Sequence, residues 1–139
     1  MEIIAVATQT VAENQNVLFT DNVTGGNCSI THRDGSGQIT LRGTTAQCRA
    51  RYKVSFGGNI AVATGGTAGP ISVALAIDGE AIGASTMTVT PAAVDEYHNV
   101  FGAMFIDVPK NCCLTVSVQN ISTQSIFVQN ANLIVERVA

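Results

Sequence analysis

The stretch that decides the fold class of this chain is residues 69–79, Gly-Pro-Ile-Ser-Val-Ala-Leu-Ala-Ile-Asp-Gly. Large apolar side chains alternate with Ser or Ala from position 71 to 77, and the stretch ends in Asp78-Gly79. Strict alternation predicts a β-strand, and Asp-Gly is a strong signal for the tight turn of a hairpin. Only small side chains occupy the second face of this strand. We therefore expect a core on one side and, on the other, a surface that a neighbour can approach closely.

The rest of the chain consists of short β-rich runs separated by turn clusters, and helical periodicity is absent. Runs expected as strands include 3–11, 17–20, 38–42, 48–56, 59–63, 84–90, 99–108, 112–119 and 126–138. Residues 22–27 are expected as a loop, and the loop 92–95 could hold one turn of helix. About nine or ten strands at intervals of roughly 8–15 residues are typical of an antiparallel sandwich. The sequence therefore predicts one all-β domain over 1–139, an antiparallel jelly-roll sandwich.

The last expected strand is apolar on both faces around Leu133-Ile134-Val135. A strand of that kind is expected in the middle of a sheet, covered on both sides.

Charged residues are scarce. They make up 12% of the 139 residues, against roughly 25% in average soluble domains. Such a chain has difficulty covering the surface of a monomer with polar groups, so we expect part of its surface to be buried between subunits. The net charge of −3 gives no general affinity for nucleic acids or anionic membranes.

Targeting signals are also missing from the sequence. No apolar run approaches the roughly 18 residues of a membrane span. The first residues, 1–7, lack the basic region of a signal peptide. We expect synthesis in a bacterial cytoplasm without membrane insertion, and a final location in a virion or outside the cell, reached by a route such as lysis.

The four cysteines are Cys28, Cys48, Cys112 and Cys113, and they lack the C-x-x-C spacing of a zinc site. We expect buried free thiols that pack as small hydrophobic side chains. A disulfide between Cys28 and Cys48 is an alternative, and a metal-binding or catalytic role is a further one.

Several runs in the last two-thirds of the chain carry a family pattern. They are the strand 37–41, the stretch 48–56 (Cys-Arg-Ala-Arg-Tyr-Lys-Val-Ser-Phe), the Asp78-Gly79 hairpin and the stretch 128–138, which contains Asn-Ala-Asn-Leu-Ile-Val. This pattern resembles the trimeric jelly-roll heads of the tumour-necrosis-factor and complement globular-head superfamily. It is most similar to bacterial and phage members such as the head of the exosporium collagen-like glycoprotein.

The resemblance implies a homotrimer in which aromatic and aliphatic side chains pack around the axis. The residues that match the packing positions, in the core or between subunits, are Tyr52, Phe56, Phe105, Leu133 and Val135. No collagen-like Gly-X-Y stalk is present in the sequence. A head without a stalk looks like a phage or prophage virion component, such as a capsid decoration or fibre-tip protein.

Basic residues are concentrated in one strand, where Arg49, Arg51 and Lys53 alternate with Ala50, Tyr52 and Val54. Their side chains are expected on one face. We expect this row to pair across strands or subunits with acids, the candidates being Asp95, Glu96, Asp107 and Glu136. The alternative is a docking face for an acidic partner.

All the aromatic side chains that lie within expected strands are interpreted as core: Phe19, Tyr52, Phe56, Phe101, Phe105 and Phe127.

Enzymatic function is not expected, and neither is a cofactor or a bound metal. His32 near Asp34 has no nucleophile beside it, and Asp95-Glu96-Tyr97-His98 is interpreted as a solvated loop rather than a metal site. The sequons at Asn22, Asn27 and Asn120 are interpreted as chance matches.

The function expected from the sequence is a non-enzymatic, self-assembling structural protein of a phage or prophage virion. Its partners would be copies of itself and other virion proteins. The alternative is a head domain on a bacterial surface that binds a receptor or a surface glycan.

Overall fold

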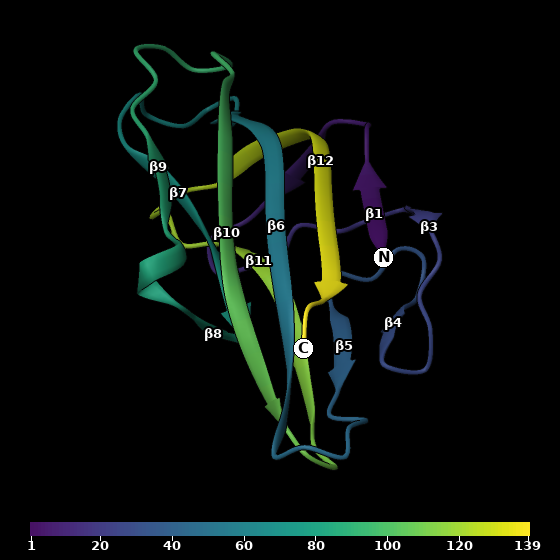
Figure 1. The fold of residues 1–139 in the computed structure, drawn as a ribbon. Helices are drawn as coiled ribbons and strands as arrows, with labels where there is room; N and C mark the ends of the chain where they lie inside the picture. The colour runs from purple at the N-terminus through teal and green to yellow at the C-terminus, as the bar shows by residue number, and fades with distance from the viewer.

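The chain folds into two antiparallel β-sheets packed face to face, and the computed structural model describes residues 1–139 (Figure 1). The elements are β1 (Glu2–Ala5), β2 (Gln9–Val11), β3 (Asp21–Thr24), β4 (Ile30–His32), β5 (Ile39–Arg42), β6 (Arg49–Val62), β7 (Ile71–Ile77), β8 (Glu80–Ala81), the 3-10 turn η1 (Gly83–Ser85), β9 (Met87–Val89), β10 (His98–Pro109), β11 (Cys113–Asn120) and β12 (Ile126–Arg137).

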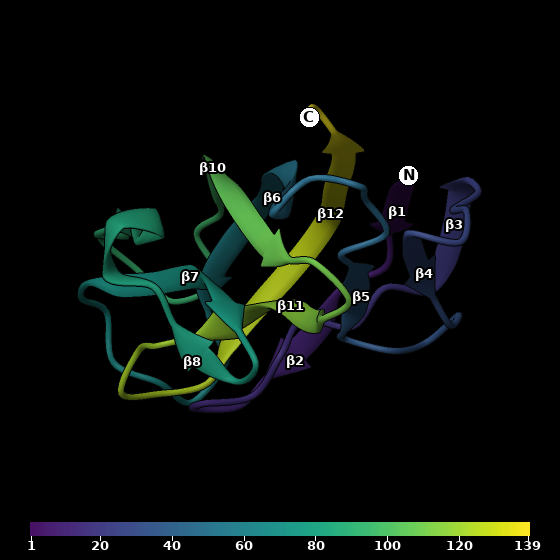
Figure 2. The same cartoon turned by 60° about the horizontal axis from the view of Figure 1, so that its bottom comes forward.

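One sheet has the strand order β10-β6-β12-β1-β3, with β2 paired to β12. The other has the order β4-β5-β11-β7-β8, with β9 paired to β7. Figure 2 shows the two layers from one end, with the loops β5–β6 and β10–β11 toward the viewer. The predicted antiparallel sandwich is confirmed.

The hairpin predicted at Asp78-Gly79 is present between β7 and β8, where Ile77 pairs with Glu80. Both turn residues have positive φ, 52° at Asp78 and 87° at Gly79. That combination is typical of the turn type whose twist matches the flanking strands, and Asp-Gly favours it because both residues tolerate the left-handed region. Ile71, Val73 and Leu75 of β7 are fully buried in the core.

The long strand β6 runs without a break from Arg49 to Val62, so the two strands expected at 48–56 and 59–63 are a single strand. Neither Gly57 nor Gly58 has a positive φ. The pairing register between β12 and β6 shifts between Gln129 and Asn132, so a bulge of β12 faces this point. A Cβ on Gly58 would lie 3.4 Å from the Cα of Ala131 and 3.2 Å from the ring of Phe56. The glycine therefore allows the bulge to pack closely rather than ending the strand.

The expected strand 17–20 is absent, and the expected loop 22–27 holds β3 instead. The backbone amides of Val17, Phe19 and Thr20 donate to Val118, Ser36 and Ile4, which lie in three separate parts of the fold. A segment whose hydrogen bonds go to different elements satisfies its backbone without forming a ladder.

Two further expected segments are divided or displaced. The run 3–11 divides into β1 and β2, and 84–90 divides into η1 and β9. The loop 92–95 contains no helical turn, which occurs at η1 instead.

The core between the sheets is built mainly from aliphatic side chains with three buried aromatic rings. Phe19 and Phe56 meet edge to face with ring centroids 6.5 Å apart. The Tyr52 hydroxyl donates to the carbonyl oxygen of Arg42 at 2.6 Å, which joins β6 of one sheet to β5 of the other. Tyr52, Phe56, Leu133 and Val135 are all buried within a single chain.

Candidate functional site

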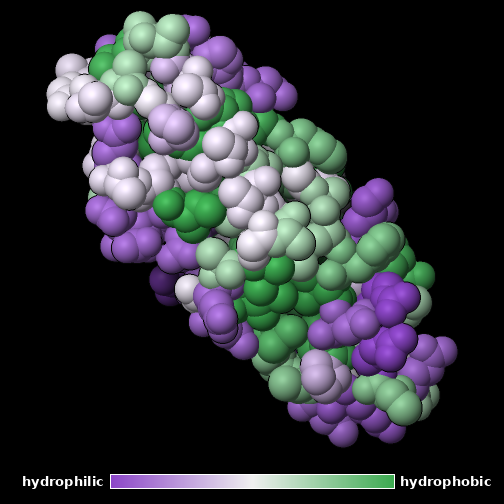
Figure 3. Space-filling view, turned by 90° about the vertical axis from the view of Figure 1, so that its left-hand side faces the viewer, coloured by the Kyte–Doolittle hydropathy of each residue, from purple (hydrophilic) through white to green (hydrophobic).

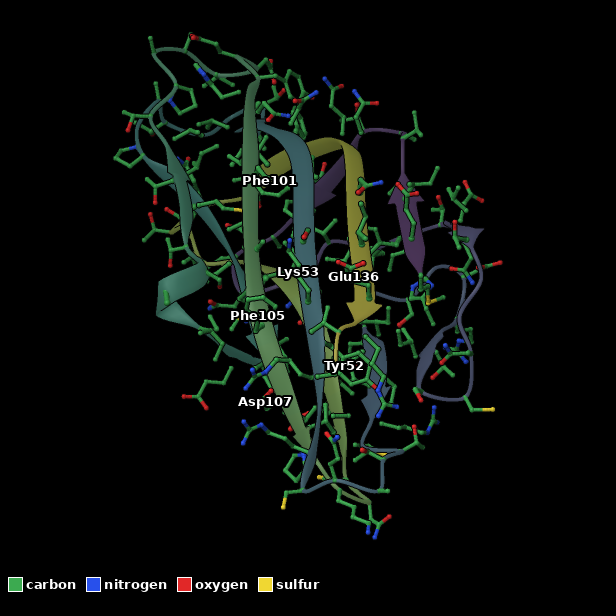
Figure 4. All side chains as sticks on the ribbon, viewed as in Figure 1. Tyr52, Lys53, Phe101, Phe105, Asp107 and Glu136 are labelled. Carbon is green, nitrogen blue, oxygen red and sulfur yellow. The ribbon has the colours of Figure 1, made fainter.

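Two phenylalanine rings on β10 point away from the core. Phe101 is 69% exposed and Phe105 is 61% exposed, whereas Val100 and Ile106 of the same strand are buried. The strand alternation places both rings on the outer face of the β10–β6–β12 sheet, together with Asp107 (Figure 4). The expectation that Phe101 and Phe105 belong to the core of the chain is therefore wrong.

The neighbouring strand β6 does not cover the Phe101 and Phe105 rings. Phe101 lies opposite Gly57, Ala103 opposite Ser55 and Phe105 opposite Lys53. A Cβ on Gly57 would lie 3.7 Å from the Phe101 ring, so this ring packs against the β6 backbone.

On the other side of β6, Asn132 lies opposite Gly57 and Ile134 opposite Ser55. Ile134 is 42% exposed, so the last strand is central in its sheet but is covered on one side only within a single chain. Figure 3 views the side of the molecule that lies to the left in Figure 1, where β7, β8 and β9 lie, and hydrophobic atoms gather in the middle and lower part of that side. The outer face of β10, β6 and β12 is turned toward the viewer in Figure 1. We call the surface formed by Phe101, Ala103, Phe105, Ser55 and Ile134 the apolar face.

A charged group borders the apolar face beyond Phe105, where Figure 4 labels Asp107. Arg51 donates two hydrogen bonds to Asp107, from Nε at 2.8 Å and from Nη2 at 3.1 Å. The Nε of Arg49 lies 3.2 Å from the same carboxylate. The hydrogen bonds from Arg51 hold the pKa of Asp107 below its ordinary value, and the same hydrogen bonds raise the pKa of Arg51. The carboxylate thus neutralises part of a basic row rather than standing free as an acid or base.

Lys53 completes the row that the sequence predicts on one face of β6. It lies opposite Glu136 on one side and Phe105 on the other, and it forms no ion pair within the chain. Of the four acids considered as partners for the row, Asp107 is the one that ion-pairs with it.

The four cysteines are free thiols, and all are exposed, which corrects the expectation that they are buried. Each lies in a loop or at a strand end, where neither sheet covers it. Local sequence does not reveal this, because Cys is usually among the most buried residue types.

Other side chains considered for chemistry are engaged in local hydrogen bonds. His32 lies between the side-chain oxygen of Asn22 at 2.7 Å and the carbonyl oxygen of Ser36 at 2.8 Å. Asp95 accepts from the Thr64 hydroxyl, and His98 contacts Glu96 at 3.1 Å. No group of three or more His, Cys, Asp or Glu side chains is placed to hold a metal ion. None of the helical segments is long and apolar enough to cross a membrane.

The signal that sequence reasoning missed is the position of Asp107. It shares the outward face of its strand with Phe101 and Phe105, at a spacing of two, whereas Ile106 and Val108 share the other face. A carboxylate on the same face of the strand as Phe101 and Phe105 indicates that this face is not buried within the chain.

Comparison with known proteins gives the fold. No protein-family model and no curated protein sequence matches this chain. Among solved structures, the globular domain of zebrafish complement 1qA is similar, with 13% identity, a TM-score of 0.62, and coverage of 96% of this chain and 93% of that one. Rabbit GITRL has 13% identity and a TM-score of 0.43 over 79% of this chain and 77% of its own. The C-terminal domain of EclA, described as a sugar-binding protein, has 17% identity and a TM-score of 0.43 over 96% and 81%. The chain has the jelly-roll fold of the complement globular domain.

Proposed function

We propose that this chain is a non-enzymatic head domain that assembles into a homotrimer through the apolar face and serves as a structural component of a virion. The observation that carries the proposal is the exposure of Phe101 and Phe105 on a sheet that is otherwise well packed. Exposed aromatic side chains rimmed by polar groups are typical of interaction sites in proteins.

The energy available from these rings is large for their number. An aromatic side chain buries about 200 Å², and each Å² of apolar surface is worth about 25 cal/mol. With 69% and 61% of the rings still accessible, covering both would contribute up to about 6 kcal/mol per chain. The costs of association reduce this figure, but the sum is of the size that a specific oligomer needs.

The neighbouring surface suits close approach by another copy. Gly57, Ser55 and Ala103 place small uncharged residues beside the rings, and the charged groups Lys53 and Asp107 lie at the Phe105 end. β10 is the edge strand of its sheet because it hydrogen-bonds only with β6, and Met87 of β9 in the other sheet lies close to it at Gly102. A second copy could therefore lay its edge against this face, and the resemblance to trimeric heads supports three copies around an axis.

Light scattering coupled to size exclusion tests the assembly. We expect a mass of three times the 14.4 kDa chain at micromolar concentration. Replacing both rings, Phe101→Ser with Phe105→Ser, is expected to yield a folded monomer. Leu18→Ser is the matched control, because Leu18 is 49% exposed but lies away from the apolar face, on the segment between β2 and β3. A stable wild-type monomer would refute the proposal, and so would a double variant that remains a trimer.

The role in a virion is supported by the scarcity of charge and by the resemblance to phage heads. Mass spectrometry of purified particles from the source tests it, with capsid and portal proteins as the reference for stoichiometry. Absence of the chain from particles that contain those proteins would refute the virion role and leave the assembly untouched.

A second candidate function is a head that binds a surface glycan. A shallow hollow of about 420 Å³ on β4, β5 and the loop between them supports it. Its lining is entirely polar: Thr31, His32, Arg33, Ser36, Gln38 and Thr40. Hydroxyl, amide and guanidinium groups in such a hollow can pair with the hydroxyl and acidic groups of a sugar. A glycan array with Arg33→Gln as the comparison tests this role.

A further inference from the structure

The cysteines gather at one end of the sandwich, in three neighbouring loops. We call this surface the cysteine end: the loops 25–29, 43–48 and 110–112, with Cys113 at the start of β11. The carbonyl oxygen of Cys48 accepts from the amide of Lys110 at 3.0 Å, and that of Cys112 accepts from Gly43 at 2.9 Å. These bonds join the second loop to the third, at the lower end of Figure 1.

The first loop joins the same surface through β5. Arg42 donates from Nη1 to the carbonyl oxygen of Cys28 at 3.5 Å, and its amide donates to Ser29 at 2.9 Å. In the sheet, Arg42 is also the register partner of Cys113. The loops and the strand end that carry the four cysteines are therefore joined by hydrogen bonds and strand pairing, although Cys28 and Cys113 are 85 positions apart in the sequence.

Packing does not account for these cysteines. No cysteine is among the buried residues of the core, and none is paired within the chain. The three loops carry a single charged residue, Lys110. The flanking Arg137 extends back to donate to the carbonyl oxygen of Thr44 at 2.7 Å. The thiols are exposed on loops that are themselves nearly uncharged, and Arg42, Arg49 and Arg137 lie at the rim of these loops.

We propose that the cysteine end is a covalent junction at which two copies of this chain join through intermolecular disulfides. A second copy is the occupant that matches the site, because a two-fold contact of one surface with itself brings an equal set of thiols to each side. A partner with a single thiol could form a disulfide with only one of the four cysteines and would leave the other three free.

The reaction is thiol–disulfide exchange with a small-molecule disulfide such as glutathione disulfide. A thiolate of one copy attacks a sulfur of the small disulfide and releases one reduced thiol. A thiolate of the second copy then attacks the mixed disulfide and releases the other. Two protein thiols are oxidised, one small disulfide is reduced, and the two protons pass to the released thiols. In a reducing compartment the thiols stay free, so the junction forms only where the surroundings are oxidising.

The test compares reduced protein with protein treated with glutathione disulfide, at equal concentration. Light scattering of the reduced protein gives the non-covalent mass. Non-reducing gel electrophoresis in detergent, with intact mass and peptide mapping, then gives the covalent state. We expect a detergent-resistant dimer that reductant reverses, with linked peptides from the cysteine end of both chains. Mixing ¹⁵N-labelled with unlabelled protein identifies the link as intermolecular.

The matched control carries its thiol at the opposite end. All four cysteines are changed to Ser and Ala93→Cys is added, in the exposed loop between β9 and β10. We expect the wild-type protein to form the covalent dimer at least about a hundredfold faster than this control, because four thiols against one account for up to about sixteenfold by number and a specific contact raises the effective thiol concentration beyond that.

Three outcomes would overturn the junction: four free thiols after oxidation, disulfides within single chains only, or a control that cross-links as fast as the wild type. The reduced mass reports separately on the trimer. A monomeric reduced protein would refute the apolar-face assembly while the covalent dimer still forms.

Discussion

Replacing the buried side chain of Asn120 is expected to cost the domain a large part of its stability. This asparagine is fully buried at the end of β11. Its amide nitrogen donates to the carbonyl oxygens of Val11 and Gln124, each at 3.0 Å, and its side-chain oxygen accepts from the amide of Ser122 at 2.9 Å. The side chain thus joins β2, the end of β11 and the β11–β12 loop.

Asn120→Ala removes three hydrogen bonds and leaves three backbone groups without that partner. A hydrogen bond contributes about 1 kcal/mol net, and a buried group left unsatisfied costs about 1–3 kcal/mol. Allowing for partial relaxation, we expect a loss of about 3–5 kcal/mol, out of roughly 5–15 kcal/mol for a typical domain. With an m-value near 2 kcal/mol/M, the urea midpoint should fall by about 2 M.

The assay is urea unfolding followed by circular dichroism, at matched protein concentration. Asn22→Ala is the control, because Asn22 is an exposed sequon asparagine that also bonds through both side-chain atoms, to His32. We expect it to change stability by about 0.5 kcal/mol or less. A midpoint for Asn120→Ala no lower than that of the control would refute the reasoning.

Three further predictions concern ion pairing, a core hydroxyl and a loop glycine. The hydrogen bonds from Arg51 lower the pKa of Asp107, so the ion pair stabilises the fold fully above the pKa that this carboxyl has in the unfolded chain. This stabilisation is lost as the pH falls through the lower pKa of the folded state. In Asp107→Asn, the urea midpoint should therefore fall less on acidification than in the wild type. Tyr52→Phe leaves the Arg42 carbonyl without its 2.6 Å donor and should cost about 1–2 kcal/mol by thermal unfolding, whereas Tyr97→Phe, whose hydroxyl makes no hydrogen bond in the chain, should cost nothing measurable. Gly43→Ala places a Cβ 2.0 Å from the carbonyl oxygen of Pro109 and should cost about 2–3 kcal/mol by urea unfolding, whereas Gly25→Ala meets nothing within 4 Å and should be neutral.

The strands of the sandwich interior were accessible to sequence reasoning because their signals are local. Alternation over 71–77 and the left-handed tolerance of Asp78-Gly79 act between residues close in sequence, so they specify a strand and its turn without further context. The outward direction of Arg49, Arg51 and Lys53 follows from the same alternation. Segments with weak alternation, such as 17–20, depend on which distant carbonyls they meet, and there the prediction failed.

The candidate site was less accessible, because exposure depends on what lies across a sheet and beyond its edge. The two-residue alternation of a strand places Phe101 and Phe105 on one face of β10. Whether that face is buried depends on the rest of the fold, which places Gly57 and Lys53 of β6 beside the rings and leaves the rings exposed to solvent. The exposed positions of the four cysteines likewise result from long-range pairing that brings three loops to one end. The sequence by itself determined that this protein is an antiparallel β-sandwich with a low-charge surface, since composition and alternation are local properties. Only the tertiary structure decided which apolar rings and thiols remain uncovered, because burial is set by segments distant in sequence that meet when the sheets close.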